Sequence, residues 1–497
     1  MKSLLGSSLF GVIALLNLVE FSQAVVSDPQ AWITANPGLT KISHVDQSIY
    51  QIIDTFGRVR FFHGTNVVKK SAPWYRQETF TPGDSFGLTD VQNLQNLGVN
   101  AVRLGHHWAG AEPVRGQYNQ TFIDIMASQT KLAEDHGIYV LVDVHQDVLA
   151  AQFCGHGVPN WFAHSDWVSS LKRFPVPQKL TAFSVDSNGI PSSSDCDSLD
   201  WSLSYLTIAV ANGFGRLYNN YDGLGDAFSA YWKKLAQTYT GTNNILGYNL
   251  LNEPWVGDHY ADPTLLTPGV ADHKTMEALW NRASTQIRSV DNNTLIWFEG
   301  STYDILSGFN NVPLGDGSKT VQSFHYYSPP QLGSIEDTIK NRITDNKRLK
   351  TASVLTEFTM WMGDSTQMSN IQSAVDTSDK YMTSWMGWAY ENLYNSDGTP
   401  HPELKAHYSR AYPSAIAGTP QSFGFNSADS SFSLVYAVKM SIDAPTEIVL
   451  PAGTYPNGYT VTISPSGSIS QVVKDPRTLA LFATTTATEG QTCLYCR

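Results

Sequence analysis

The feature that most constrains the fold of this chain is a series of eight short apolar segments that recur along most of its length. Each is strand-like, and most are followed by a longer stretch with helical periodicity. The segments are RFFHGTNVV (60–68), NAVRLGHHW (100–108), IYVLVDVHQ (138–146), ILGYNLLNE (245–253), TLIWFEG (294–300), VQSFHYYS (321–328), ASVLTEF (352–358) and WMGWAYEN (385–392). Alternating strands and helices indicate a parallel sheet, and nearly continuous apolar strands indicate burial on both faces. Eight such units predict a (β/α)8 TIM barrel of class α/β.

The connections between these segments predict helices and one large insertion. The amphipathic stretches are 90–97, 122–136, 226–239, 273–290 and 334–349. The connection after the third segment, 147–222, is too long for a structureless barrel loop unless it is functional. It contains an apolar segment, 199–218.

The last part of the chain has a different pattern. After about Ala411 helical periodicity stops, and short alternating segments such as SFSLVYAVK and YTVTISPSG are separated by Gly, Pro, Ser and Asn. This pattern predicts a small antiparallel β-sandwich. The 497 residues suit a large barrel with one smaller module. We therefore expect a signal peptide at 1–24, a barrel domain at 25–411 and a C-terminal β-sandwich domain at 412–497.

The N-terminus and the charge indicate where the protein acts. Lys2, the apolar stretch 4–19 and the small-x-small site at 22–24 are typical of a secretory signal peptide. Sequons at Asn119 and Asn292 agree with that route. We expect a secreted protein, or one in the lumen of a digestive vesicle or lysosome-like compartment. A net charge of −12 with scattered Lys and Arg argues against nucleic acid as a partner.

The four cysteines could oxidise in such a compartment. Cys154 and Cys196 bracket much of the long insertion and are the expected pair. Cys493 and Cys496 form a CxxC tail, for which a local disulfide is preferred over a metal or redox pair, because no second CxxC and no adjacent histidine accompany it.

Polar side chains gather at the C-terminal ends of the apolar segments, where a parallel barrel places its catalytic groups. They are Arg103, His107, His145, Asp147, Asn252, Glu253, Glu299, His325, Tyr327, Glu357, Trp388 and Glu391. Two of these ends, NEP at 252–254 and the TEF of VLTEF, carry a glutamate. A pair of carboxylates suits cleavage of a glycosidic bond, with one as acid/base and the other as nucleophile. Metal catalysis is not expected, since no HExxH or similar helical pair is present.

With a barrel and two such glutamates, the chain resembles glycoside hydrolase family 5 and, within it, the endoglycoceramidases. The stretches that carry the resemblance are FHGTNVVKKSAPWY, NAVRLGHHWAGAEP, VLVDVHQDVLAAQFCGHGVPNWF, YNLLNEPW, SFHYYSPP, VLTEF and GWAYEN. They extend over 61–392, and a C-terminal β-sandwich also fits this family. The string HQD followed by GHGVPNWF, together with the two glutamates, is the most specific part.

The resemblance implies a role for each residue at the strand ends. Glu253 would be the acid/base and Glu357 the nucleophile of a retaining double displacement, which requires the two carboxyl groups to lie about 5–5.5 Å apart. Asn252 would bind the 2-hydroxyl of the sugar at the cleavage site. Arg103 and Tyr327 would orient Glu357.

The resemblance also implies a substrate-binding group and leaves some residues open. His145, Asp147 and Lys70 would bind hydroxyls of the reducing-end glucose, with Lys69 as an alternative to Lys70. Trp388 would stack beneath the sugar, and His325 would orient the acid/base. The roles of His63, His107 and Glu299 are left open.

The implied function is hydrolysis of the bond between oligosaccharide and ceramide in glycosphingolipids, without a metal or other cofactor. Transient contact with a membrane or micelle and dependence on a lipid activator or detergent are further expectations. The alternatives are a family 5 enzyme for another β-glucoside, such as a steryl glucoside or a polysaccharide, and a silent glycan- or lipid-binding protein. Retention of both glutamates disfavours the silent protein. The segment 199–210, with Phe153, Trp161 and Phe162, is expected to form an apolar wall for the ceramide, or else to pack on the barrel.

Overall fold

A computed structural model describes residues 25–163, 185–302, 306–329 and 331–496 of the chain. The expected signal peptide lies outside these residues. Among the helices of the described part, none combines the length and the apolar character that crossing a membrane requires.

The centre of the protein is a closed barrel of eight parallel strands, in the order β10-β11-β4-β5-β6-β7-β8-β9. All eight expected strands are present, and the prediction of a TIM barrel is confirmed. The strands are β4 (His63–Val67), β5 (Ala101–Gly105), β6 (Tyr139–Asp143), β7 (Ile245–Asn249), β8 (Ile296–Glu299), β9 (Thr320–Tyr326), β10 (Ala352–Phe358) and β11 (Trp385–Gly387).

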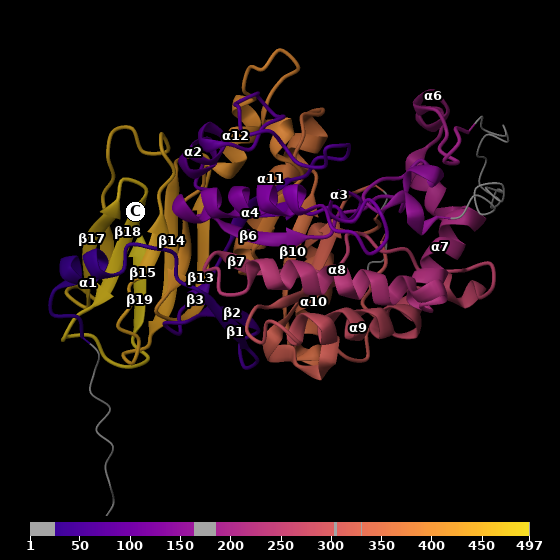
Figure 1. The fold of residues 1–497 in the computed structure, drawn as a ribbon. Coiled ribbons are helices and arrows are strands. Elements are labelled where there is room, and N and C mark those ends of the chain that lie inside the picture. The colour runs from indigo at the N-terminus through magenta and orange to yellow at the C-terminus, as the bar shows by residue number, and fades with distance from the viewer. Residues whose placement is uncertain (1–24, 164–184, 303–305, 330, 497) are drawn as a thin grey trace, which may run out of the picture.

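Helices cover the outside of this barrel (Figure 1). Those between the strands are α2 (Leu88–Asn96), α3 (Trp108–Ala111), α4 (Gln120–Asp135), α6 (Ser193–Asp197), α7 (Ile208–Tyr218), α8 (Leu224–Tyr239), α9 (Glu277–Arg288), α10 (Ile335–Leu349) and α11 (Ser365–Lys380), and α12 (Pro402–Tyr408) follows the last strand. Each of the five expected helices is present. A π-helical turn, η6 (Asp272–Met276), forms the first part of the stretch expected at 273–290.

The barrel interior is filled at its N-terminal end by side chains from successive strands, including Tyr139, Leu141, Leu246 and Trp297. Gly247 makes room for the largest of them, since a Cβ there would lie 2.1 Å from the indole nitrogen of Trp297. With this end of the barrel interior packed, a site is expected at the C-terminal end, where barrels of this kind place their catalytic groups.

The C-terminal domain consists of two antiparallel sheets, as predicted. One has the order β1-β2-β3-β12-β15-β18-β17 and the other β13-β14-β19-β16. Their strands are β1 (Ile42–Asp46), β2 (Gln51–Asp54), β3 (Val59–Arg60), β12 (Tyr412–Ile416), β13 (Gly418–Asn426), β14 (Ser431–Val438), β15 (Thr446–Val449), β16 (Thr462–Ser464), β17 (Ile469–Asp475), β18 (Thr478–Ala483) and β19 (Thr492–Cys496). Buried apolar residues of both sheets share one core.

The first three strands of this domain come from the N-terminal part of the chain, which was expected to belong to the barrel domain alone. Strand β3 pairs antiparallel with β12, so that Val59 lies opposite Ile416 and Arg60 opposite Ala415. The helix α1 (Pro29–Ala35) lies beside β17 and β18 at the same end of the molecule (Figure 1). The two ends of the chain therefore build this domain together.

Cys493 and Cys496 lie within β19. Their side chains are outside the part of the chain that the structure describes, so the expected local disulfide between them stays a prediction.

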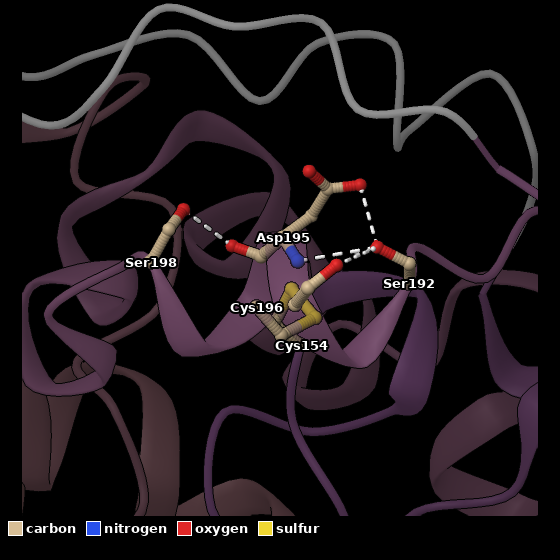
Figure 2. The surroundings of a disulfide bond; sticks show 6 residues. Cys154, Ser192, Asp195, Cys196 and Ser198 are labelled. Atoms are coloured by element: carbon tan, nitrogen blue, oxygen red, sulfur yellow. Dashed lines mark hydrogen bonds between the residues drawn. A yellow bond between two sulfur atoms is a disulfide. The ribbon is translucent and has the colours of Figure 1, made fainter.

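The described part of the long insertion after β6 lies at the end of the barrel that faces away from the C-terminal domain, where α6 and α7 are found (Figure 1). The disulfide between Cys154 and Cys196 is present as expected and ties the start of the insertion to α6 (Figure 2). Ser192 caps this helix, because its hydroxyl accepts a hydrogen bond from the backbone N–H of Asp195 at 3.2 Å. The cap and the disulfide hold this part of the insertion in place.

Candidate active site

The strand ends predicted from the sequence converge on one open cavity of about 660 Å³. It is lined by Lys70, His145, Asp147, Ser202, Leu203, Leu206, Glu253, Trp255, Tyr327, Pro329, Glu357, Trp361 and Trp388. Seven residues predicted from the sequence are in this set. The other three bond to the glutamates or to one another: Arg103 and Asn252 are buried, and His325 is half-buried.

The two glutamates face each other across the floor of the cavity. Glu253 follows β7, and Glu357 lies near the end of β10. A carboxylate oxygen of one lies within 4.8 Å of a carboxylate oxygen of the other. This separation is close to that of retaining glycosidases, about 5–5.5 Å, and leaves too little room for the water of an inverting enzyme.

Glu357 is held at both of its oxygens. Arg103 Nη1 donates to Oε1 at 2.6 Å, and the hydroxyl of Tyr327 donates to Oε2 at 2.7 Å. Burial raises the pKa of Glu357 above its ordinary 4.5, and the positive charges of His325 and Arg103 oppose that rise. With both oxygens accepting hydrogen bonds, the carboxylate is oriented as a nucleophile.

Arg103 is the centre of a buried network beneath the cavity. Its guanidinium also donates to Asn249 at 2.8 Å, to Asn252 at 2.9 Å and to Glu299 at 3.1 Å, and it lies 2.8 Å from Asp143. Burial opposes the charge of Arg103, but these carboxylates and Glu357 outweigh it and raise its pKa. The network fixes the floor of the site as one rigid unit.

His325 lies between the two glutamates. Its Nδ1 is 2.9 Å from a carboxylate oxygen of Glu253 and 3.7 Å from one of Glu357. Burial disfavours the charged ring, but Glu357, Glu299 and Glu253 outweigh burial and raise the pKa of His325 to about 9. The ring is therefore a cation at neutral pH.

A second group of polar residues lines one side of the cavity. Lys70 Nζ lies 2.7 Å from Asp147 and 4.5 Å from the centre of the Trp388 ring. The ring of His145 stacks on the same tryptophan, with centroids 5.2 Å apart. Burial works against ionisation of Asp147, but Lys70 and His156 outweigh it and lower its pKa well below 3.8. These residues present a charged, aromatic surface that suits a sugar.

The structure also distinguishes the two neighbouring lysines. Lys69 is paired with Asp84 and lies outside the set that lines the cavity, whereas Lys70 is part of it. Lys70 is therefore the lysine that can reach a ligand.

His145, Asp147 and His156 lie close enough together to hold a metal ion. The ammonium of Lys70 already provides a cation 2.7 Å from the shared carboxylate. A divalent ion at the same oxygen would face the repulsion of this charge. The donor set is therefore a poor fit for a metal.

The other side of the cavity is apolar and only partly as expected. Leu203 and Leu206, from the turn η3 (Trp201–Leu206), line it. Phe153, Phe162 and Val210 instead lie buried in the core around the barrel, and Trp161 packs against that core. The wall expected from 199–210 with these three aromatic residues is thus wrong for most of its members. The side chain of Trp201 lies outside the described part.

Several residues of the site were missed or left open by the sequence. Trp255 and Trp361 line the cavity from loops, and Trp361 stacks on Tyr327 with centroids 5.9 Å apart. Loop residues carry no periodicity, so only their position just after each glutamate could have indicated them. His63 is remote from the cavity, because it stacks against Trp385 and Tyr412 and pairs with Asp379.

Comparison with known proteins identifies the family and the fold. The family model described as cellulase (glycosyl hydrolase family 5) matches residues 63–393, and that of the glycoside hydrolase family 5 C-terminal domain matches 410–493. The chain is 35% identical to an endoglycoceramidase of Cyanea nozakii over 88% of this chain and 90% of the relative. It is 36% identical to an endoglycoceramidase of Hydra vulgaris, with 88% of each chain covered. A solved structure of endo-glycoceramidase II from Rhodococcus sp., titled as a lactosyl-enzyme intermediate, has the same fold, with a TM-score of 0.73, 21% identity and 90% of this chain and 99% of that chain covered.

Proposed function

The chain belongs to glycoside hydrolase family 5, among the endoglycoceramidases, and we propose that it cuts the β-glycosidic bond between oligosaccharide and ceramide with retention of configuration. The observation that carries the mechanism is the pair Glu253 and Glu357, with carboxylate oxygens within 4.8 Å at the ends of barrel strands.

In the first step Glu253 gives a proton to the oxygen of the glycosidic bond while Glu357 attacks the anomeric carbon. The bond to ceramide breaks, and an ester joins the sugar to Glu357. Arg103 and Tyr327 hold the attacking oxygens, since each donates a hydrogen bond to one of them. Asn252 is fixed by its bonds to Arg103 and to the backbone of Gln146, in a place to bind the 2-hydroxyl.

In the second step Glu253 removes a proton from water, which attacks the same carbon and releases the oligosaccharide in its β form. Negative charge moves from Glu357 to Glu253 in the first step and returns in the second. The cationic ring of His325 lies within 3.7 Å of both carboxylates, so it stabilises the charge in either position.

Two groups of lining residues support a substrate that is part sugar and part lipid. Lys70, Asp147 and Trp388 offer charge, hydrogen bonds and a ring to the glucose. The apolar surface is offered by Leu203, Leu206, Trp255, Pro329 and Trp361. Each methylene group buried there contributes about 0.8 kcal/mol, so even partial cover of a ceramide strengthens binding.

Contact with a membrane or micelle is part of this proposal. Apolar side chains protrude from the connections that follow three barrel strands, on the same side as the cavity: Leu306 after β8, Leu332 after β9, and Trp361 and Met362 after β10. Leu332 is 80% exposed. Apolar side chains on the loops around a lipid-binding site suit a lipid surface.

This contact can be tested with ganglioside in phospholipid vesicles and in detergent micelles. Leu332→Ser should lower turnover on vesicles several-fold and leave turnover on micelles unchanged. Val473→Ser is the matched control, because Val473 is 59% exposed on β17 in the C-terminal domain. Equal rates for wild type and Leu332→Ser on vesicles would contradict the contact.

Secretion, or entry into the lumen of a vesicle, is also proposed. The Cys154–Cys196 disulfide requires an oxidising compartment, and the sequon residues Asn119 and Asn292 are exposed. Expression in a secretory cell should give a glycosylated product in the medium. The change in gel mobility on deglycosylation should be smaller for each Asn→Gln variant and absent for the double variant.

The decisive experiment offers the purified protein ganglioside, lactosylceramide, glucosylceramide, a steryl glucoside and carboxymethylcellulose. Release of intact oligosaccharide and free ceramide is expected. Preference for the steryl glucoside or the polysaccharide would favour another family 5 activity, and no turnover would favour a silent binding protein. NMR of the first-formed sugar should show the β anomer, and an initial α anomer would contradict the double displacement.

A further inference from the structure

Glu299 lies at the end of β8, beneath the cavity and outside the set of residues that line it. It nevertheless contacts two parts of the catalytic machinery. It is 3% exposed. Its Oε1 accepts hydrogen bonds from Arg103 at 3.1 Å and from Asn249 at 3.0 Å, and its Oε2 accepts one from the backbone N–H of Glu253 at 2.9 Å. One carboxylate thus links the buried network to the main chain of the acid/base.

The main chain of Glu253 needs such support. Its φ is +40°, in the left-handed region that residues with a Cβ rarely adopt. A conformation of this kind persists only where the surroundings fix it, and here the acceptor for its N–H is a charged oxygen. Because the backbone of Glu253 sets where its side chain points, Glu299 sets the position of the acid/base without touching the cavity.

Glu299 also lies near His325, on the side of the ring that carries Nε2. The distance from His325 Nε2 to Glu299 Oε1 is 3.7 Å, while the other ring nitrogen faces Glu253 and Glu357. The other charged groups at this place are Arg103 on β5, which binds two of these carboxylates, and Arg342 on α10, which lines a small adjoining cavity with His325. Tyr327 is neutral there, since burial raises its pKa.

We propose that Glu299 is a positioning residue of this hydrolase, which fixes the backbone of Glu253 and places a carboxylate beside His325. This inference rests on the proposed double displacement. Glu357 loses its charge when the ester forms, and Glu253 is an anion only while the ester exists. Glu299 takes no part in either change, so the charge on His325 has a constant partner through both steps.

The test compares Glu299→Gln with wild type in the full-length enzyme, on lactosylceramide and on 2,4-dinitrophenyl β-lactoside. The dinitrophenyl group of the second substrate leaves without a proton donor. The kcat/KM for this substrate therefore measures the attack of Glu357 alone. Glu299→Gln should lower kcat/KM on lactosylceramide by about 10- to 100-fold, because the amide has only one acceptor oxygen and cannot serve donors on both sides of the native carboxylate. It should leave kcat/KM on the aryl lactoside nearly unchanged. Loss of the charge on His325, whose pKa is about 9, contributes to the alkaline limb of the pH profile, and this limb should move to lower pH in Glu299→Gln because a neighbouring negative charge is lost.

Two further variants separate placement, charge and general stability. Glu299→Asp keeps the charge but shortens the side chain, so its alkaline limb should stay near that of wild type while kcat falls. Glu112→Gln is the matched control, because Glu112 is a buried glutamate that accepts hydrogen bonds from Trp108 and from a backbone N–H away from the catalytic pair. The Glu112→Gln variant should leave unchanged both the pH profile and the ratio of kcat/KM on lactosylceramide to kcat/KM on the aryl lactoside.

The outcomes distinguish this inference from the function on which it rests. If wild type fails on both substrates, the proposed hydrolysis is wrong. If wild type is active and Glu299→Gln keeps the wild-type pH profile, or loses activity equally on both substrates, Glu299 is a structural residue and the inference is wrong.

Discussion

The Nδ1 atom of His325 lies 2.9 Å from Oε1 of Glu253. Since the ring is a cation at neutral pH, this nitrogen donates to Oε1 and leaves Oε2 of the protonated acid free to carry its proton to the substrate. Once the proton has left, the same nitrogen can still donate to Oε1. The pair can therefore serve both steps of the reaction without a change of geometry.

Glu357→Gln should abolish turnover of lactosylceramide and of the aryl lactoside, because an amide cannot form the glycosyl ester. The fold should survive, since the amide oxygen can still accept a hydrogen bond from Arg103 or Tyr327. Rates are measured for both substrates, with circular dichroism and Tm to check folding. A variant that is folded and retains more than about 1% of the wild-type rate would contradict Glu357 as the nucleophile.

Glu253→Gln should lower turnover of lactosylceramide by a factor of about 10²–10⁴, the usual contribution of general acid–base catalysis. An aryl lactoside with an activated leaving group should still form the ester, because that group leaves without a proton. A burst of released phenol followed by slow hydrolysis would identify the role. Equal losses of ester formation on both substrates would show that Glu253 is not the acid.

The stability of the protein should depend on pH through His325. Its pKa is raised from 6.5 to about 9 in the folded state, so its stabilising contribution is complete below about pH 6.5 and is lost as pH rises through about 9. The shift corresponds to at most about 3 kcal/mol. Denaturant unfolding of wild type and His325→Gln at pH 6 and about pH 9.5 measures it. The difference between the two proteins should shrink at the higher pH, and a constant difference would contradict the charged ring.

Replacement of Leu203 and Leu206 by Ser should raise KM for lactosylceramide several-fold, because about 1.5–3 kcal/mol is available from each fully buried leucine. Hydrolysis of the soluble aryl lactoside should change little, since it has no acyl chains. Val473→Ser again serves as the control for an exposed apolar side chain remote from the cavity. If both substrates suffer alike, the two leucines support the barrel and do not bind lipid.

Much of the fold followed from local patterns, because each barrel strand is a short apolar segment that ends in polar residues. The helix α11 did not, since of its sixteen residues only Ile371, Ala374, Val375, Ser378 and Asp379 are buried, which leaves almost no apolar stripe. The pairing of β3 with β12 could not be predicted either, because no sequence pattern indicates which strands pair when they lie far apart in the chain.

Some residues of the site could be predicted from the sequence and others could not. Residues at strand ends were predictable, because the barrel brings all such ends to one face. The role of His156 and that of Glu299 were not predictable. His156 reaches Asp147 only because the insertion folds back to form a bridge between these residues. Glu299 was recognised as a strand-end residue, yet its role depends on a contact with the main chain of Glu253, and no sequence pattern encodes such a contact.

The pairing of β3 with β12 also has a consequence for the order of events during synthesis. Strands β1, β2 and β3 leave the ribosome before the barrel, but β12, the partner strand of β3, follows the whole barrel. Until β12 emerges, one edge of β3 has no neighbour from the C-terminal part of the chain. Loss of the C-terminal segment would therefore leave an unpaired strand at the N-terminus, with a sheet edge open to aggregation.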